Sequence, residues 1–234
     1  MKFSATPAGT DWCWRGKSWR AAFLATAVAL AGVQAAPAQL NVLRRDYRPN
    51  NVFAFPAKLP LEFRRVAVLP VAAGATESSL ADGSAALGPV LYDQLVKTKR
   101  FEVVSVDPAS LRRGTGQSAW AGTETLPTDF LGFLRREYDC DGVLFAELTS
   151  YHAYAPLAIG WRLKLVDARS GQIIWAADEV FDATRPSVQR AAERFENQHI
   201  HWPFVHEENW QALNSPRQFG RYAIATLLGS LPGR

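Results

Sequence analysis

Residues 66–71 constrain the fold more than any other part of the chain, because every one of them is apolar. The segment reads Val-Ala-Val-Leu-Pro-Val, so an extended chain here presents apolar side chains on both of its faces. A strand without a polar face has to be covered on both sides, which is typical of a sheet flanked by helices. The segment therefore predicts a layered structure of strands and helices.

Strand patterns and helical patterns alternate after this segment. Apolar residues recur at spacings of three and four over residues 87–95, which predicts a helix. Residues 101–106 predict a second strand, apolar residues at 130–134 predict another helix, and residues 143–151 predict a third strand. A helix between two strands of one sheet predicts a crossover, which makes those strands parallel.

The next two strands are predicted to form a hairpin. Residues 160–167 alternate apolar side chains with Arg162 and Lys164, and residues 172–178 return after a turn at 168–171. One charged face and one apolar face indicate a half-solvated, antiparallel part of the sheet.

Two helices are predicted to end the chain, beginning near Ser187 and Ser215. The element order is then β-α-β-α-β-β-β-α-α. The predicted fold class is α/β, a single-domain sandwich with a mixed β-sheet and helices packed on it, over residues 64–234.

Residues 1–38 have the parts of a cleavable signal peptide. Basic residues precede an uncharged apolar run at 21–33, and small residues follow it. The run is shorter than the roughly 20 residues that span a bilayer, which disfavours the alternative of an uncleaved anchor. Cleavage is expected after Ala35 or Ala38. The chain is therefore predicted to be periplasmic or secreted, with peripheral association with the outer membrane left open.

The charge of the chain belongs mostly to this leader. The formal net charge is +4, and residues 1–38 hold four basic residues and one acidic residue, a net of +3. The remainder holds 22 basic and 21 acidic residues, a net of +1. A nearly neutral mature chain lacks the electrostatic footprint of a nucleic-acid binder, so no nucleic-acid partner is expected.

The leader also lacks the residue that a lipid anchor needs. Leu30-Ala31-Gly32 matches the first three positions of a bacterial lipobox, but Val33 stands where the lipid-carrying Cys belongs. No lipid anchor is therefore expected at this site. Cys140 is the one cysteine after the leader, so the mature chain has no internal disulfide, and a buried thiol is expected.

Residues 39–63 are predicted to be an extended arm or linker. Pro49, Pro56 and Pro60 each bias the preceding residue away from a helical conformation. A tether and an arm packed on the surface of the domain are both compatible with this pattern.

Several segments together resemble the periplasmic CsgG/LpoB/FlgO group, whose fold is related to the N-terminal domain of TolB. Residues 65–70 are similar to the opening strand of that group, and residues 95–99 to the end of its first helix. Residues 100–104, 141–144 and 165–175 are similar to its later strands and its hairpin. The resemblance covers residues 64–182, and the part from 183 to 234 is not accounted for by it.

The resemblance implies a non-catalytic envelope protein that acts as a scaffold or activator in the assembly of a cell-surface or cell-wall structure. Its partners would be envelope proteins, with a homo-oligomer left open, and no cofactor is expected. The curli-secretion member forms a pore from long hairpins, and a spanning strand takes about 9–11 residues. The predicted hairpin is shorter, is the only one predicted and carries Arg162 and Lys164, so no transmembrane pore is expected.

Aromatic residues are the candidate partner-binding residues, because large aromatic side chains anchor interfaces well. The candidates are Trp120, Phe195, Trp202, Phe204 and Trp210. Packing on the core is the alternative for those at 195–210, and a single exposed aromatic is the alternative for Trp120.

Histidines in the same segment support a second hypothesis, a periplasmic metal- or ligand-binding protein that uses residues 195–210. His199, His201 and His206, with the adjacent Glu207 and Glu208, are residue types that hold zinc. Neither an HExxH pattern nor a CxxC pair is present, so no metal site is expected.

Catalytic motifs are absent from the sequence. The chain has no GxSxG, P-loop or GxGxxG pattern. Asp139 and Asp141 flank Cys140, and adjacent carboxylates raise a thiol's pKa. The chain is therefore predicted not to be an enzyme, and a Cys- or metal-dependent hydrolase is the competing class.

Overall fold

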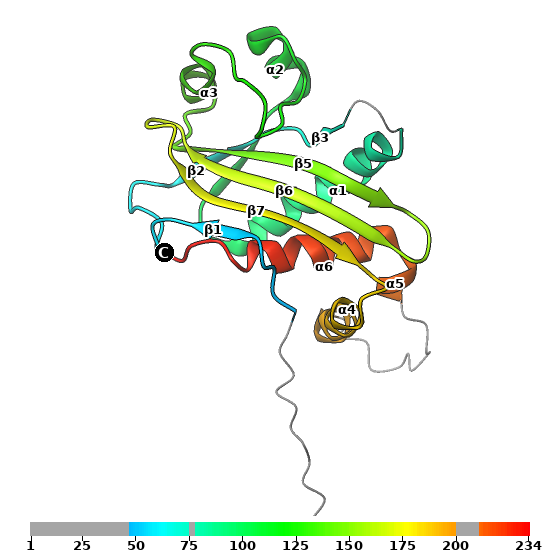
Figure 1. Ribbon diagram of the computed structural model, residues 1–234. Coiled ribbons are helices and arrows are strands. Elements are labelled where there is room, and N and C mark those ends of the chain that lie inside the picture. Colours follow the sequence, from blue (N-terminus) through cyan, green and yellow to red (C-terminus); the bar gives the residue numbers. More distant parts are fainter. Residues whose placement is uncertain (1–46, 75–77, 200–210) are drawn as a thin grey trace, which may run out of the picture. The chain divides into compact units, whose positions relative to one another are not determined.

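The computed structural model describes residues 47–74, 78–199 and 211–234. The predicted signal peptide and the first part of the predicted arm lie outside these ranges. Within them, seven strands form one sheet in the order β1-β7-β6-β5-β2-β4, with β3 beside β5 (Figure 1). The strands are β1 Val52–Ala54, β2 Arg65–Val68, β3 Ala72–Ala73, β4 Glu102–Ser105, β5 Gly142–His152, β6 Ala158–Asp167 and β7 Ile173–Asp182. The helices are α1 Ser78–Thr98, α2 Pro108–Thr115, α3 Phe130–Tyr138, α4 Pro186–His199, α5 Gln211–Asn214 and α6 Pro216–Leu228.

The sheet is mixed, as the sequence predicts. β2 pairs in parallel with β4 and with β5, while β5, β6, β7 and β1 are antiparallel neighbours. The crossover from β2 to β4 contains α1, and the crossover from β4 to β5 contains α2 and α3. The predicted α/β class is therefore confirmed.

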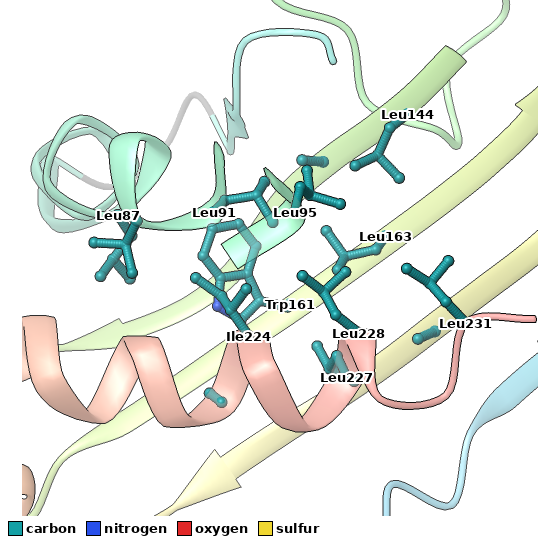
Figure 2. Close-up of a cluster of buried hydrophobic side chains, with 14 of the residues drawn as sticks. Leu87, Leu91, Leu95, Leu144, Trp161, Leu163, Ile224, Leu227, Leu228 and Leu231 are labelled. Carbon is teal, nitrogen blue, oxygen red and sulfur yellow. The ribbon is translucent and has the colours of Figure 1, made fainter. Parts of the chain in front are cut away.

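One face of the sheet is covered by α1 and α6, which also pack against each other. Figure 2 shows leucines of α1 and α6 around the ring of Trp161 on β6. We call this cluster the helix-face core. Its central members include Leu87, Leu91, Leu95, Trp161, Leu163, Ile224, Leu227 and Leu228, each at most 2% exposed. Burying each leucine contributes about 1.5 to 3 kcal/mol, so this layer is a main source of stability.

The start of α6 lies at Ser215, as the sequence predicts. Ser215 is the N-cap, and its Oγ accepts a hydrogen bond from the backbone N–H of Gln218 at 3.4 Å. Pro216 occupies the start of the helix, where its missing N–H costs nothing.

The opposite face of the sheet carries a smaller layer made of α2, α3 and the loop at 116–129. Their buried side chains meet Ala67 and Leu69 from β2 and its extension, and Val143 and Phe145 from β5. We call this cluster the second core. It covers β2, β5 and the end of β6 next to the turn at 168–171. Figure 1 shows the rest of β6 and β7 without a helix over this face.

The expectation of a single hairpin is wrong. β5 and β6 also form an antiparallel pair, joined at residues 153–157, so β5, β6 and β7 make a three-stranded meander. These strands contain 11, 10 and 10 residues, longer than predicted. The exclusion of a pore therefore loses the support of strand number and length and stays a prediction. Among the described helices, none is long and apolar enough to cross a membrane.

The described part of the predicted arm lies against the sheet. β1 pairs with β7, and the Tyr47 hydroxyl donates to Glu179 Oε1 at 2.7 Å. Burial, followed by this contact with Glu179, raises the pKa of Tyr47 to about 12. Leu59 and Phe63 are buried in the helix-face core. Residues 47–63 thus pack on the domain, with Val52–Ala54 as a strand of its sheet, and the predicted boundary at residue 64 divides a packed segment.

Candidate binding surface

The register of the strands shows which side chains share the face that carries α2 and α3. Residues opposite each other in paired strands project from the same side of a sheet. Phe145 of β5 is opposite Lys164 of β6, Lys164 is opposite Ala176 of β7, and Ala176 is opposite Phe53 of β1. Phe145 is buried in the second core, so Phe53 projects from that same face.

Two rows of residues on this face run from buried apolar side chains at one end to exposed apolar side chains at the other. Phe145 is 2% exposed, whereas Phe53, at the other end of the same row, is 51% exposed. In the next row, Val143 and Val166 are buried, and Ile173 of β7 is 41% exposed. The covering layer therefore ends over β6, while apolar side chains extend to β7 and β1.

These exposed side chains line one shallow hollow. Phe53, Phe55, Ile173 and Ala176, together with the turn residues Gly171 and Gln172, border a volume of about 670 Å³. Phe55 is 68% exposed. We call Phe53, Phe55, Ile173 and Ala176 the open surface. Single exposed apolar residues are common, whereas a group of apolar residues around one hollow is a candidate interaction site.

A row of paired charges crosses the same face beside the open surface. Arg162 Nε donates to Asp178 Oδ2 at 2.8 Å, and Arg162 Nη1 donates to Glu147 Oε2 at 3.2 Å. The hydrogen bond with Asp178 raises the pKa of Arg162 above its usual value. Protein interfaces have an apolar centre and a polar rim, and the open surface with this row of charges beside it has the same arrangement.

Trp120, a predicted partner-binding residue, lies in the second core. It is 5% exposed, and its ring meets Phe130 edge-on with centroids 5.5 Å apart. Its Nε1 donates to Thr115 Oγ1 at 2.9 Å. Lys164 of β6 holds the loop to the sheet near Trp120, because its Nζ donates to the carbonyl of Gly122. The structure thus gives Trp120 a packing role, and its role in binding stays a prediction.

Phe195 on α4 is half-buried and packs on the helix-face core. Its ring centroid is 5.9 Å from that of Tyr222, and the guanidinium of Arg221 lies 5.8 Å from the same ring. Burial raises the pKa of the Tyr222 hydroxyl well above its usual value. Phe195 is therefore far from the open surface in the fold, on the face that α6 covers.

The other predicted residues lie outside the described part of the chain. Trp202, Phe204 and Trp210 fall there, as do His201 and His206, and the side chain of His199 is likewise not described. Among the described residues, no group of three or more His, Cys, Asp or Glu side chains could hold a metal ion. The binding and metal hypotheses for residues 199–210 stay predictions.

Cys140 is buried, as expected, and its thiol donates to the carbonyl of Leu134 at a distance of 3.6 Å. Burial raises the pKa of this thiol. A buried thiol that resists ionisation is a poor nucleophile, because the thiolate is the reactive form.

Sequence reasoning missed the open surface. The alternation Phe53-Ala54-Phe55 was a signal of a strand with one apolar side, but the surrounding prolines favoured an unpaired arm. Ile173 was predicted as a strand residue without any indication of its exposure.

No protein-family model matches the chain, and the curated proteins contain no match to it. Among solved structures, the chain is similar to the PelC dodecamer of Paraburkholderia phytofirmans, with 14% identity and a TM-score of 0.46, over 79% of this chain and 97% of that one.

Two further solved structures are similar to smaller parts of the chain. Lipoprotein GNA1162 of Neisseria meningitidis has 14% identity and a TM-score of 0.39, over 58% of this chain and 96% of that one. The LpoB C-terminal domain of Salmonella enterica has 15% identity and a TM-score of 0.34, over 54% of this chain and 86% of that one. LpoB belongs to the group that the sequence resembles, and likenesses this distant do not bear on function.

Proposed function

We propose that the chain is an exported, non-catalytic envelope protein that acts as a scaffold or activator by binding another envelope protein through the open surface. Export follows from the signal-peptide pattern of residues 1–38. The role in envelope assembly follows from the sequence resemblance to the CsgG/LpoB/FlgO group.

The observation that carries binding is the end of the covering layer over β6. Phe53 and Ile173 lie at the exposed ends of two rows that begin in the second core at Phe145 and Val143, and together with Phe55 they line one hollow. Exposure of apolar side chains to water is unfavourable by about 25 cal/mol for each Å² of apolar area. A protein partner that covers these residues recovers that free energy.

A double substitution tests this function. Phe53→Ser with Phe55→Ser should lower the recovery of the partner from the native envelope by at least about tenfold, because aromatic anchors dominate interface energies. Both side chains are more than half exposed, so the free energy of unfolding should change by only about 0.5 kcal/mol each. The measurement is quantitative co-purification after crosslinking in the envelope, with an unfolding curve for each variant.

Tyr154→Ser is the matched control, since Tyr154 is 88% exposed and lies at 153–157, the end of the meander opposite the turn at 168–171. Equal recovery with the double variant and with the wild-type chain would show that the open surface is not the binding site.

A further inference from the structure

A second hollow adjoins the open surface across the β6–β7 turn. It has a volume of about 410 Å³ and lies between α3 and the turn residues 168–171. Leu126, Pro127 and Leu131 form its apolar wall, and Arg135 and Arg169 also line it. We call it the turn hollow.

Gly171 borders both hollows. Its φ is +73°, a conformation that glycine adopts without strain, and it carries no side chain to separate the two hollows. The turn hollow and the open surface therefore adjoin at a residue without a side chain, the first with a mixed polar and apolar lining and the second with an apolar one.

The charges at the turn hollow do not balance. The carboxylate of Asp129 is engaged by Arg136 at 2.6 Å. Arg135 forms no ion pair with any described residue, and its side chain is exposed. Arg135 is therefore a guanidinium at the hollow without an ion-pair partner among the described residues.

Arg169 is almost as free as Arg135. Its one ion pair among the described residues is a long contact to Asp141 Oδ1 at 3.7 Å, and 65% of its side chain is exposed. The other oxygen of Asp141 accepts the backbone N–H groups of Arg64 and Arg65, so this carboxylate is shared. Two guanidinium groups with unused donors thus line a hollow that also has an apolar wall.

We propose that the partner docks through an acidic, apolar peptide segment that spans both hollows. This inference rests on the proposed function and names the chemistry of its partner. Carboxylates of the segment lie between Arg135 and Arg169, since guanidinium groups bind carboxylates in a planar, two-bond geometry. Its apolar side chains cover Phe53, Phe55 and Leu131. The apolar contacts supply the affinity, and the charges select the partner and speed its association.

A selection from displayed random short peptides on the purified exported protein tests this chemistry. The selected peptides should carry more Asp and Glu than Lys and Arg, together with apolar residues. Reversing both charges, with Arg135→Glu and Arg169→Glu, should weaken their binding at least about tenfold, or about 1.4 kcal/mol. The doubly neutral variant, Arg135→Gln with Arg169→Gln, should show a smaller loss in the same direction.

The control makes the same change in charge elsewhere, with Arg190→Glu on α4 and Arg217→Glu on α6, both of which are exposed. This variant should bind the selected peptides like the wild-type chain. Selected peptides without an acidic excess, no selected peptide at all, or equal binding by the reversed variant would overturn the proposal. The proposal would also be overturned if the charge-reversed variant lost self-association, or lost binding to vesicles of anionic phospholipid, in place of peptide binding. Any of these results together with position-dependent crosslinking at Phe53 would leave the binding function intact and reject only the acidic partner.

Discussion

Replacing Trp161 with alanine is expected to lower the free energy of unfolding by about 3 to 5 kcal/mol, the range for truncating a buried tryptophan. Trp161 is fully buried, and its ring lies between the leucines of α1 and α6 over the middle strand of the meander (Figure 2). The substitution removes contacts with both helices at once and leaves a cavity that rigid elements cannot close. Denaturant unfolding measures the loss.

Trp161→Phe is the informative control. The buried Nε1 of Trp161 has no hydrogen-bond partner, so phenylalanine removes an unsatisfied donor while it keeps an aromatic ring. The gain from the deleted N–H partly offsets the lost ring volume, and the net cost should be about 1 kcal/mol or less. A cost of Trp161→Phe as large as that of Trp161→Ala would show that the N–H group is stabilised in a way that this packing does not explain.

Replacing Trp120 with alanine is expected to cost about 3 kcal/mol, although the residue lies in a loop rich in Gly, Ser and Thr. Trp120 joins the loop at 116–129 to Phe130 of α3 and, through its N–H, to Thr115 of α2. Its loss should therefore loosen the whole covering layer. Thermal or denaturant unfolding is the measurement.

Tyr154→Ala, at an exposed loop position, is the comparison for Trp120 and should change stability by about 0.5 kcal/mol or less. Partner binding that falls in the Trp120→Ala variant while its stability is unchanged would contradict the packing role and favour direct contact with the partner.

The layered core followed from the sequence because burial leaves a periodic pattern. Val66, Ala67 and Val68 are buried on both sides of β2, and α1 buries the leucines that recur at helical spacing. The hairpin between β5 and β6 was missed because residues 153–156 read Ala-Tyr-Ala-Pro, without the Asn-Gly or Asp-Gly signal of a tight turn.

The open surface could not be predicted in the same way. Whether Phe53 is buried depends on how far α2 and α3 extend over β7, and this follows from their tertiary packing rather than from the residues around Phe53. Trp120 illustrates the opposite case, since a polar loop suggested exposure while the loop folds over its tryptophan. Local patterns report which side of a strand is apolar, and the neighbouring elements decide whether that side is covered.

Site-specific photo-crosslinking tests the central claim most directly. A photoreactive residue at position 53 of the exported chain, irradiated in the native envelope, should give a defined adduct with another envelope protein. The same residue at position 154 should give none, and Phe55→Ser should strongly reduce the adduct formed from position 53. Adducts of equal yield from both positions, or no adduct from position 53, would contradict a binding role for the open surface.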